Sequence, residues 1–202
     1  MQSAQVILAS GSPFRRQMLE NAGVAITVVP ADVDEAAIRA ALQDDNPDIE
    51  PQDVAEVLAR AKAEQVSAMH PGAFVIGADQ VLACGGEIFA KPPTISDARS
   101  QLIRLRGLAH SLPTAAVIAI DGATVWSHLD EPILTMRPVS DNFLDKYLAS
   151  EGNAVCETVG GYKLEGLGAQ LFESIEGDYF SIIGLPLLPL LGELRSRKVI
   201  VT

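Results

Sequence analysis

The amino-acid sequence predicts a mixed α/β fold. Short apolar stretches with the composition of β-strands alternate with segments in which apolar residues recur at helical spacing. Two glycine-containing turns, Gly85-Gly86 and Asp121-Gly122, each stand between two strand-like stretches and are typical of β-hairpins. Hairpins join antiparallel neighbours, so we expect a mixed sheet flanked by helices and not a purely parallel one.

The first half of the chain begins with a strand that runs directly into a helix. Ser12 is a good N-cap, Pro13 suits the first helical position, and Gly23 ends the helix. Residues 44–51 are polar and proline-rich, so we expect a loop there, followed by a long helix whose apolar residues are three and four apart. The elements expected in this half are strands at residues 5–9, 25–29, 73–83 and 87–90 and helices at residues 14–21 and 52–68.

The second half is expected to contain a hairpin between capped helices. Asp121-Gly122 joins the two hairpin strands, and Ser96 and Ser140 are expected to cap helices. A glycine-rich segment covers residues 160–168. The elements expected in this half are strands at residues 112–120 and 124–137 and helices at residues 96–106, 140–149 and 185–194.

Length and composition limit the class of protein. A chain of 202 residues, of which 48% are hydrophobic, suits one α/β domain or two small lobes that share a core. The sequence has no uncharged apolar run of 18 residues, and its first ten residues lack the basic residues of a secretion signal. We therefore expect a cytoplasmic protein in which Cys84 and Cys156 are ordinary free thiols.

The net charge argues against two classes of partner. With 26 acidic and 15 basic side chains the chain carries a formal charge of −11, whereas general binding to nucleic acid or to an anionic membrane needs a basic surface. A small anionic substrate remains compatible with this charge if the few cations lie together. Arg15 and Arg16 are adjacent, and Lys62 and Lys91 stand in segments that can converge on them.

Residues 10–16, with the sequence SGSPFRR, indicate an anion site. A helix N-terminus presents free N–H groups and the positive end of a dipole, and Ser10, Ser12, Arg15 and Arg16 add donors and charge. The segment is not a Walker A loop, because GxxxxGK[ST] occurs nowhere in the chain. A capped surface helix with solvated arginines would explain the same residues.

Acidic residues form a second candidate constellation. Asp32, Asp34 and Glu35 follow a strand, and Asp79 lies within an apolar strand where a carboxylate needs a partner such as a lysine or a metal ion. Carboxylates from separate segments could hold Mg²⁺ or Mn²⁺ against phosphate oxygens, and one of them could activate a water molecule. A solvated loop at residues 32–35 and a structural ion pair at Asp79 are the alternatives.

Two lysines complete the candidate chemistry. Lys62 on the long helix and Lys91 before a proline could each neutralise phosphate charge in a transition state, although either could also be a surface lysine. The three histidines have no zinc-ligand spacing, so we assign them no metal role. No histidine stands near Ser10 or Ser12 in the sequence, so a covalent serine mechanism has no support.

Taken together, these motifs resemble the Maf family of nucleotide pyrophosphatases. The resemblance rests on five blocks in order: ILASGSPFRRQMLENAG near the start, VDE at 33–35, AKAEQV at 61–66, VIGADQVLACGGEIFAKP at 75–92, and GGYKLEGLGAQLFESIEGDYFSIIGLPL at 160–187. It covers nearly the whole chain, and residues 93–150 contribute least.

The resemblance implies an architecture, a reaction and a set of site residues. It implies one domain over residues 1–202, with an elongated mixed sheet flanked by helices and two lobes around a deep central cleft, as in the Maf and ITPase-like folds. The reaction would cut a nucleoside triphosphate into a monophosphate and pyrophosphate with a divalent cation (Mg, Mn or Co), often in a homodimer. Asp79 matches the catalytic carboxylate, the proposed proton acceptor. The positions matching the polar residues that handle phosphate and metal are Ser10, Arg15, Glu35, Lys62 and Lys91.

Three positions that differ between branches of this family bear on the base. Phe14, Gln80 and Glu165 are closer to the Trp, Gln and Glu typical of 7-methyl-GTP pyrophosphatases than to the Arg, Thr and Gln of the dTTP and UTP branch. An aromatic face attracts the cationic methylated guanine by roughly 0.5–2 kcal/mol, and Glu165 could accept hydrogen bonds from guanine. Phe14 departs from Trp, and the Tyr of GGYKLEG resembles the other branch.

Other functions stay open at this point. Pyrimidine triphosphates or deaminated purines such as ITP are alternative substrates. A non-catalytic nucleotide-binding regulator of septum formation is the alternative from another class, because the resemblance also links the chain to inhibition of septation.

Overall fold

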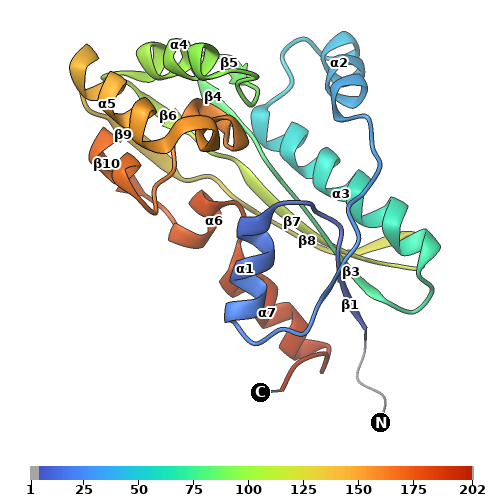
Figure 1. Ribbon diagram of the computed structural model, residues 1–202. Coiled ribbons are helices and arrows are strands. Elements are labelled where there is room, and N and C mark those ends of the chain that lie inside the picture. The colour runs from blue at the N-terminus through green and yellow to red at the C-terminus, as the bar shows by residue number, and fades with distance from the viewer. Residues whose placement is uncertain (1–4, 202) are drawn as a thin grey trace. The chain divides into compact units, whose positions relative to one another are not determined.

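The structure is a computed structural model that describes residues 5–201, and the chain divides into two compact units (Figure 1). Unit 1 covers residues 5–80, 113–130 and 178–201 of the described part, and unit 2 covers Val81–Leu112 and Glu131–Gly177. Each unit is built on one five-stranded sheet. The mixed α/β class is confirmed, with the strands distributed over two sheets. The cleft implied by the family resemblance stays a prediction.

The sheet of unit 1 has the strand order β2-β1-β3-β7-β8. Strand β1 pairs in parallel with β2 on one side and with β3 on the other, whereas β7 is antiparallel to both β3 and β8. The strands are β1 (Val6–Leu8), β2 (Thr27–Val28), β3 (Phe74–Gln80), β7 (Thr114–Ile120) and β8 (Ala123–Asp130). The carboxyl ends of three parallel strands therefore lie at one edge of this sheet.

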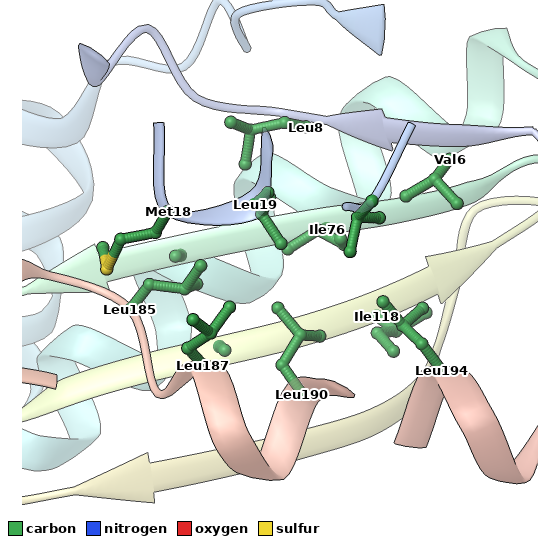
Figure 2. Packing of buried hydrophobic residues seen from close by; sticks show 13 residues of the cluster. Val6, Leu8, Met18, Leu19, Ile76, Ile118, Leu185, Leu187, Leu190 and Leu194 are labelled. Atoms are coloured by element: carbon green, nitrogen blue, oxygen red, sulfur yellow. The ribbon is translucent and has the colours of Figure 1, made fainter. Parts of the chain in front are cut away.

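Helices cover both faces of this sheet. The helices of unit 1 are α1 (Pro13–Asn21), α2 (Glu35–Asp45), α3 (Pro51–Met69), α6 (Tyr179–Ile183) and α7 (Leu187–Ser196). On one face, side chains of α1 and α7 pack against alternate residues of β1, β3 and β7, as Figure 2 shows for Leu19, Ile76 and Leu190. On the other face, Val66 of α3 belongs to a second cluster with Ile7 and Val75. Burial of these apolar surfaces is the main stabilising contribution to the unit.

The alternation of β3 decides which side chains meet α3. Ile76 belongs to the cluster with α1 and α7, and Val75 belongs to the cluster with α3. Because successive side chains of a strand point to opposite faces, positions 77 and 79 face α3 as well. A Cβ atom on Gly77 would lie only 2.2 Å from the carbonyl oxygen of Ala59, so α3 packs on β3 at a distance that only glycine permits.

The sheet of unit 2 is wholly antiparallel, with the order β10-β9-β6-β4-β5. Its strands are β4 (Leu82–Cys84), β5 (Glu87–Phe89), β6 (Ala109–Ser111), β9 (Ile133–Met136) and β10 (Phe172–Glu176). Its helices are α4 (Ile95–Leu105), α5 (Asp141–Glu151) and the 3₁₀ segments η1 (Gly152–Glu157), η2 (Val159–Gly161) and η3 (Leu167–Leu171). Inside it, the ring of His110 contacts Tyr162 and Phe172.

Several elements differ from the sequence predictions. The strand predicted at 73–83 ends at Gln80, and β4 continues in the other sheet. The strand predicted at 124–137 is likewise broken, because Pro132 cannot donate a ladder hydrogen bond. The elements that the sequence analysis did not anticipate are α2, β6, β10 and α6.

The prediction that Ser96 caps a helix is wrong, because Thr94 is the N-cap of α4 and accepts the N–H of Asp97. Three other expectations are met. Ser12 caps α1 by accepting the N–H of Arg15, with Pro13 as the first helical residue. Cys84 and Cys156 are free thiols. Within residues 5–201, no helix combines the length and the apolar character needed to cross a membrane.

Candidate active site

Most of the predicted site residues lie where three parallel strands of unit 1 end. Ser10 follows β1, Glu35 begins α2 after β2, and Asp79 and Gln80 end β3. Ligands of open α/β sheets bind outside the carboxyl ends of parallel strands. Because Asp79 and Gln80 are neighbours in one strand, their side chains point to opposite faces of the sheet.

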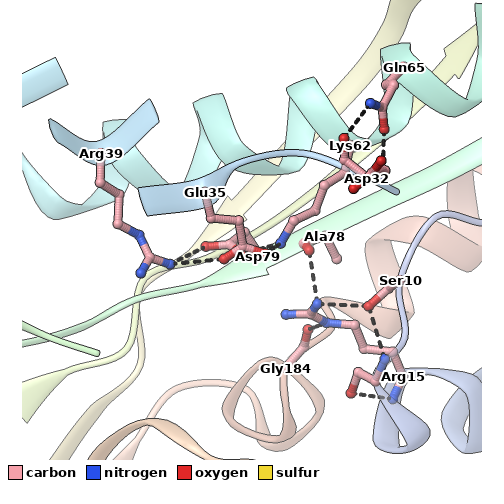
Figure 3. A network of polar contacts seen from close by, with 11 residues as sticks. Ser10, Arg15, Asp32, Glu35, Arg39, Lys62, Gln65, Ala78, Asp79 and Gly184 are labelled. Carbon is pink, nitrogen blue, oxygen red and sulfur yellow. Dashed lines mark hydrogen bonds and ion pairs between the residues drawn. The ribbon is translucent and has the colours of Figure 1, made fainter. Parts of the chain in front are cut away.

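Asp79 and Lys62 form a buried ion pair on the α3 side. The Nζ atom of Lys62 lies 2.6 Å from Oδ1 of Asp79 and 2.7 Å from Oε1 of Glu35, so one ammonium group joins both carboxylates (Figure 3). The side chains of Lys62 and Asp79 are 9% and 6% exposed, whereas that of Glu35 is 40% exposed. A pair this deep needs close geometry to offset desolvation, and the close packing at Gly77 provides it.

Arg39 is a fourth member of this cluster that the sequence analysis missed. Its Nη2 atom lies 3.3 Å from Oε2 of Glu35 and 3.8 Å from Oδ2 of Asp79. Glu35 and Arg39 are four residues apart on α2, and this spacing puts them on one face of the helix. The sequence does contain a pattern that indicates this pair, a Glu-x-x-x-Arg spacing directly after an Asp that can cap a helix. It was missed because residues 35–45 were not predicted to be helical.

The two carboxylates fit a divalent cation that also binds phosphate. Oδ2 of Asp79 is buried and has no hydrogen-bond partner, which leaves a carboxylate oxygen available to a cation. Magnesium is commonly held by one or two carboxylates together with water and substrate phosphates. No group of three or more His, Cys, Asp and Glu side chains among residues 5–201 could hold a metal ion. A cation on Glu35 and Asp79 would complete its coordination with water and phosphate oxygens.

Arg15 is anchored on the opposite face of the sheet. Its Nη1 atom donates to Oγ of Ser10 at 3.1 Å and to the carbonyl of Ala78 at 2.9 Å, and its Nε atom donates to the carbonyl of Gly184 at 2.8 Å (Figure 3). Burial lowers the pKa of Arg15 from its ordinary value, and the charges of Asp79 and Glu35 oppose this change. The guanidinium therefore fixes the ends of β1 and β3 while adding positive potential beside the carboxylates.

The other predicted residues of this segment lie at the N-cap and in the first turn of α1. Arg16 is 58% exposed and pairs with Glu20 one turn along the helix at 3.0 Å. Phe14 is half-buried. The hydroxyl of Ser12 caps the helix. Their roles in substrate binding stay predictions.

Gln80 is held by its amide nitrogen. Nε2 donates toward Oγ1 of Thr114 at 2.9 Å and toward the carbonyls of Ser181 and Ile182 at 2.9 and 3.0 Å. Two of these acceptors are backbone carbonyls, which cannot donate, so the amide nitrogen must face them. The oxygen of the Gln80 amide is thereby left as the acceptor that a ligand can use.

Two acidic residues near Glu35 have structural contacts. The carboxylate of Asp34 caps α2 by accepting the N–H of Ala37 at 2.9 Å. The backbone of Asp32 exchanges two hydrogen bonds with the side chain of Gln65, at 2.8 and 2.6 Å. Of these three acidic residues, Glu35 alone forms an ion pair with Lys62 in the described part of the chain.

Two predicted residues belong to unit 2. Lys91 is exposed in the segment between β5 and α4, and Glu165 is exposed between η2 and η3. Burial raises the pKa of Tyr147, the hydrogen bond with the backbone of Lys163 opposes this change, and the charges of Glu151 and Glu165 add to it. The catalytic role assigned to Lys91 and the base-binding role assigned to Glu165 stay predictions.

Comparison with known families agrees with this arrangement. Residues 5–197 match the family described as Maf-like protein. The chain belongs to the Maf family. The match spans both units, and so includes the carboxylate cluster of unit 1 and the segment of unit 2 that contains Lys91.

Curated relatives within the Maf family match over almost their whole length. The chain is 52% identical over 196 residues to a protein of Mesorhizobium japonicum named 7-methyl-GTP pyrophosphatase, covering 97% of this chain and 98% of the relative. It is 51% identical over 195 residues to a protein of Paramagnetospirillum magneticum named nucleoside triphosphate pyrophosphatase, covering 96% and 100%. A protein of Hyphomonas neptunium with the latter name is 50% identical over 200 residues, covering 99% and 100%.

Proposed function

We propose that this protein is a nucleoside triphosphate pyrophosphatase that hydrolyses its substrate to a nucleoside monophosphate and pyrophosphate. The observation that carries the proposal is the buried carboxylate of Asp79, which has one oxygen bonded to Lys62 and the other without a hydrogen-bond partner. A general base needs an oxygen without a hydrogen-bond partner and a fixed orientation, and this arrangement offers both. The names of the relatives support the same reaction.

The reaction assigns a role to each member of the cluster. Asp79 accepts a proton from water as the water oxygen bonds to the α-phosphorus, and the bond from that phosphorus to the bridging oxygen of the β-phosphate breaks. Pyrophosphate leaves with the electron pair of that bond. Lys62 keeps Asp79 oriented, and Arg15 adds positive potential where phosphate charge gathers. A divalent cation held by Glu35 and Asp79 would, when bound, neutralise phosphate charge.

For the base, we propose 7-methylated guanine. Phe14 is half-buried on α1 and offers an aromatic ring, and the oriented amide oxygen of Gln80 offers an acceptor for a base N–H donor. The positively charged methylated ring is attracted to an aromatic face by about 0.5–2 kcal/mol. Several curated relatives carry the name 7-methyl-GTP pyrophosphatase, which supports this choice.

The test measures products across a panel of triphosphates. The panel contains 7-methyl-GTP, GTP, dTTP, UTP, CTP and ITP, each with Mg²⁺, Mn²⁺ or Co²⁺, and chromatography identifies the nucleotide product. We expect the monophosphate without a diphosphate intermediate, highest kcat/KM for 7-methyl-GTP, and loss of turnover in Asp79→Asn. Preference for dTTP or UTP would refute the choice of base and retain the reaction. Absence of turnover for every substrate would refute the reaction itself.

Location and assembly complete the proposal. We propose that the enzyme acts in the cytoplasm as a homodimer on small nucleotides, without a nucleic-acid or membrane partner. The formal charge of −11 supports the absence of a nucleic-acid or membrane partner, because a negative protein is repelled by polyanionic surfaces. Light scattering coupled to size-exclusion chromatography tests the dimer, and a mass of one chain would refute it.

A further inference from the structure

Arg39 holds a position in the carboxylate cluster that the proposed reaction leaves unexplained. It approaches Glu35 and Asp79 from the side opposite Lys62, as Figure 3 shows. Glu35 and Asp79 carry two negative charges, and Lys62 and Arg39 carry two positive ones. The four side chains therefore form a nearly neutral group, so the carboxylates already have counter-ions before a metal ion arrives.

A divalent cation on these carboxylates would repel both of the present counter-ions. Lys62 extends from α3, its side chain is 9% exposed, and it is held at 2.6 and 2.7 Å from its two partners. Arg39 is 28% exposed and lies at the longer distances of 3.3 and 3.8 Å. It extends from α2, a helix with no fully buried side chain among its residues. Arg39 is thus the counter-ion that can leave with little loss of packing.

The present contacts of Arg39 do not satisfy its guanidinium. Its Nε atom is buried without a hydrogen-bond acceptor, and the distance of 3.8 Å from Nη2 to Oδ2 of Asp79 exceeds a hydrogen bond. A phosphate group accepts two parallel hydrogen bonds from the planar fork of an arginine, which would use Nε and a terminal nitrogen together. A phosphate next to the carboxylates would therefore suit Arg39 better than its present partners.

We propose that Arg39 exchanges partners: it is the counter-ion of Glu35 and Asp79 in the free site, and it binds a substrate phosphate when a divalent cation takes its place. The phosphate half of this inference rests on the proposed function, whereas the counter-ion half does not. Arg39 thereby couples the arrival of the metal ion to the binding of the triphosphate.

The experiment separates the two halves with three variants. Arg39→Gln removes the charge, Arg39→Lys keeps the charge but not the planar fork, and Arg60→Gln removes a matched arginine. Arg60 also pairs with a glutamate four residues earlier, but on the exposed face of α3 and away from the carboxylates. Calorimetry with Mn²⁺ alone, calorimetry with inorganic pyrophosphate at saturating Mn²⁺, and KM for the preferred triphosphate are measured for each.

Arg39→Gln should change the affinities for Mn²⁺ and for pyrophosphate in opposite directions. Arg39→Gln should bind Mn²⁺ up to about fivefold more tightly, because a competing cation is gone. It should bind pyrophosphate at least about tenfold more weakly and raise KM to a similar extent, because a charged hydrogen-bond donor is lost. Arg39→Lys should keep the wild-type affinity for Mn²⁺ and lose part of the affinity for pyrophosphate. Arg60→Gln should leave all three values unchanged.

Other outcomes overturn the inference. Weaker Mn²⁺ binding in Arg39→Gln would mean that Arg39 only shapes the metal site. Unchanged affinity for pyrophosphate would show that Arg39 does not bind phosphate. If the wild-type protein hydrolyses no triphosphate, the proposed function fails, and the two calorimetric measurements still decide the role of Arg39.

Discussion

The Nζ atom of Lys62 lies 2.6 Å from Oδ1 of Asp79, and both side chains are buried. Neither charge would be stable at this depth without the other, because an ion loses its hydration on burial. The contact exists because α3 packs on β3 at Gly77, two residues before Asp79. The packing of α3 and the geometry of the carboxylate cluster therefore depend on the same few residues.

Removing Lys62 should destabilise the protein strongly. Lys62→Met leaves the carboxylate of Asp79 buried with only the distant Arg39, and we expect a loss of about 3 kcal/mol in the free energy of unfolding. The double variant Lys62→Met with Asp79→Asn should recover part of this loss. Urea denaturation measures both, and Arg60→Met on the exposed face of α3 should change stability by less than about 0.5 kcal/mol. A double variant less stable than Lys62→Met would contradict this account.

Gly77→Ala should separate α3 from β3. The new Cβ atom would lie 2.2 Å from the carbonyl of Ala59 and 2.8 Å from the backbone nitrogen of Ala63, so backbone atoms must move. We expect a loss of about 3 kcal/mol in unfolding free energy, together with lower turnover. Gly192→Ala is the matched control, because Gly192 lies in α7 with space around it and alanine favours helix by up to about 1 kcal/mol. Equal stabilities for the two variants would refute the packing argument.

Arg15 and Arg16 should respond differently to the same substitution. Lysine cannot reproduce the three hydrogen bonds of Arg15 to Ser10, Ala78 and Gly184, so Arg15→Lys should cost about 2 kcal/mol. Arg16→Lys keeps an exposed pair with Glu20 and should cost less than about 0.5 kcal/mol. Thermal or urea unfolding of the two variants side by side checks this, and similar losses at both positions would show that the burial of Arg15 contributes little.

His110 should make stability depend on pH. Burial lowers the pKa of His110 to about 4, while its contact with the backbone of Leu108 opposes the change. An unfolded histidine has a pKa of about 6.5, so the unfolded state binds more protons between these values. The stabilisation is thus complete above about pH 6.5 and is lost as the pH falls toward 4, by about 3 kcal/mol in total.

The comparison for His110 uses a variant that does not titrate. Urea unfolding of wild type and His110→Gln at pH 7 and pH 4.5 gives the loss of stability in each, and we expect the wild type to lose about 2 kcal/mol more. Carboxylates titrate in both proteins and cancel in this difference. A variant that loses as much as the wild type would assign the acid sensitivity to other groups.

Local signals predicted much of unit 1. The cap at Ser12, the proline at position 13 and the turn at Asp121-Gly122 depend on neighbouring residues only, and each lies where the sequence placed it. For Asp79 the sequence predicted only that its carboxylate needs a partner such as a lysine or a metal ion, because a buried carboxylate requires one. Which lysine would supply it depended on the packing of α3.

Elements that are set by contacts between distant parts of the chain could not be predicted from the local sequence. Helix α2 is short and none of its side chains is fully buried, and its apolar residues Ile38, Ala41 and Leu42 give only a brief helical pattern, so Arg39 was missed with it. Strand β10 follows a glycine-rich segment and pairs with β9 about forty residues earlier, a partner that no local pattern specifies. The strand predicted over residues 73–83 was too long for the same reason. A continuous apolar run does not show that its first part belongs to one sheet and its last part to another.

The boundaries of the two units have a consequence for how such a protein can be inherited. The chain passes from one unit to the other after Gln80, Leu112, Asp130 and Gly177, so neither unit is a continuous stretch of sequence. Genetic recombination exchanges continuous stretches, and a single crossover cannot deliver either unit intact to another protein. A protein that inherits all of unit 1 as one continuous stretch therefore also inherits the segments of unit 2 that lie within that stretch, including the one with Lys91.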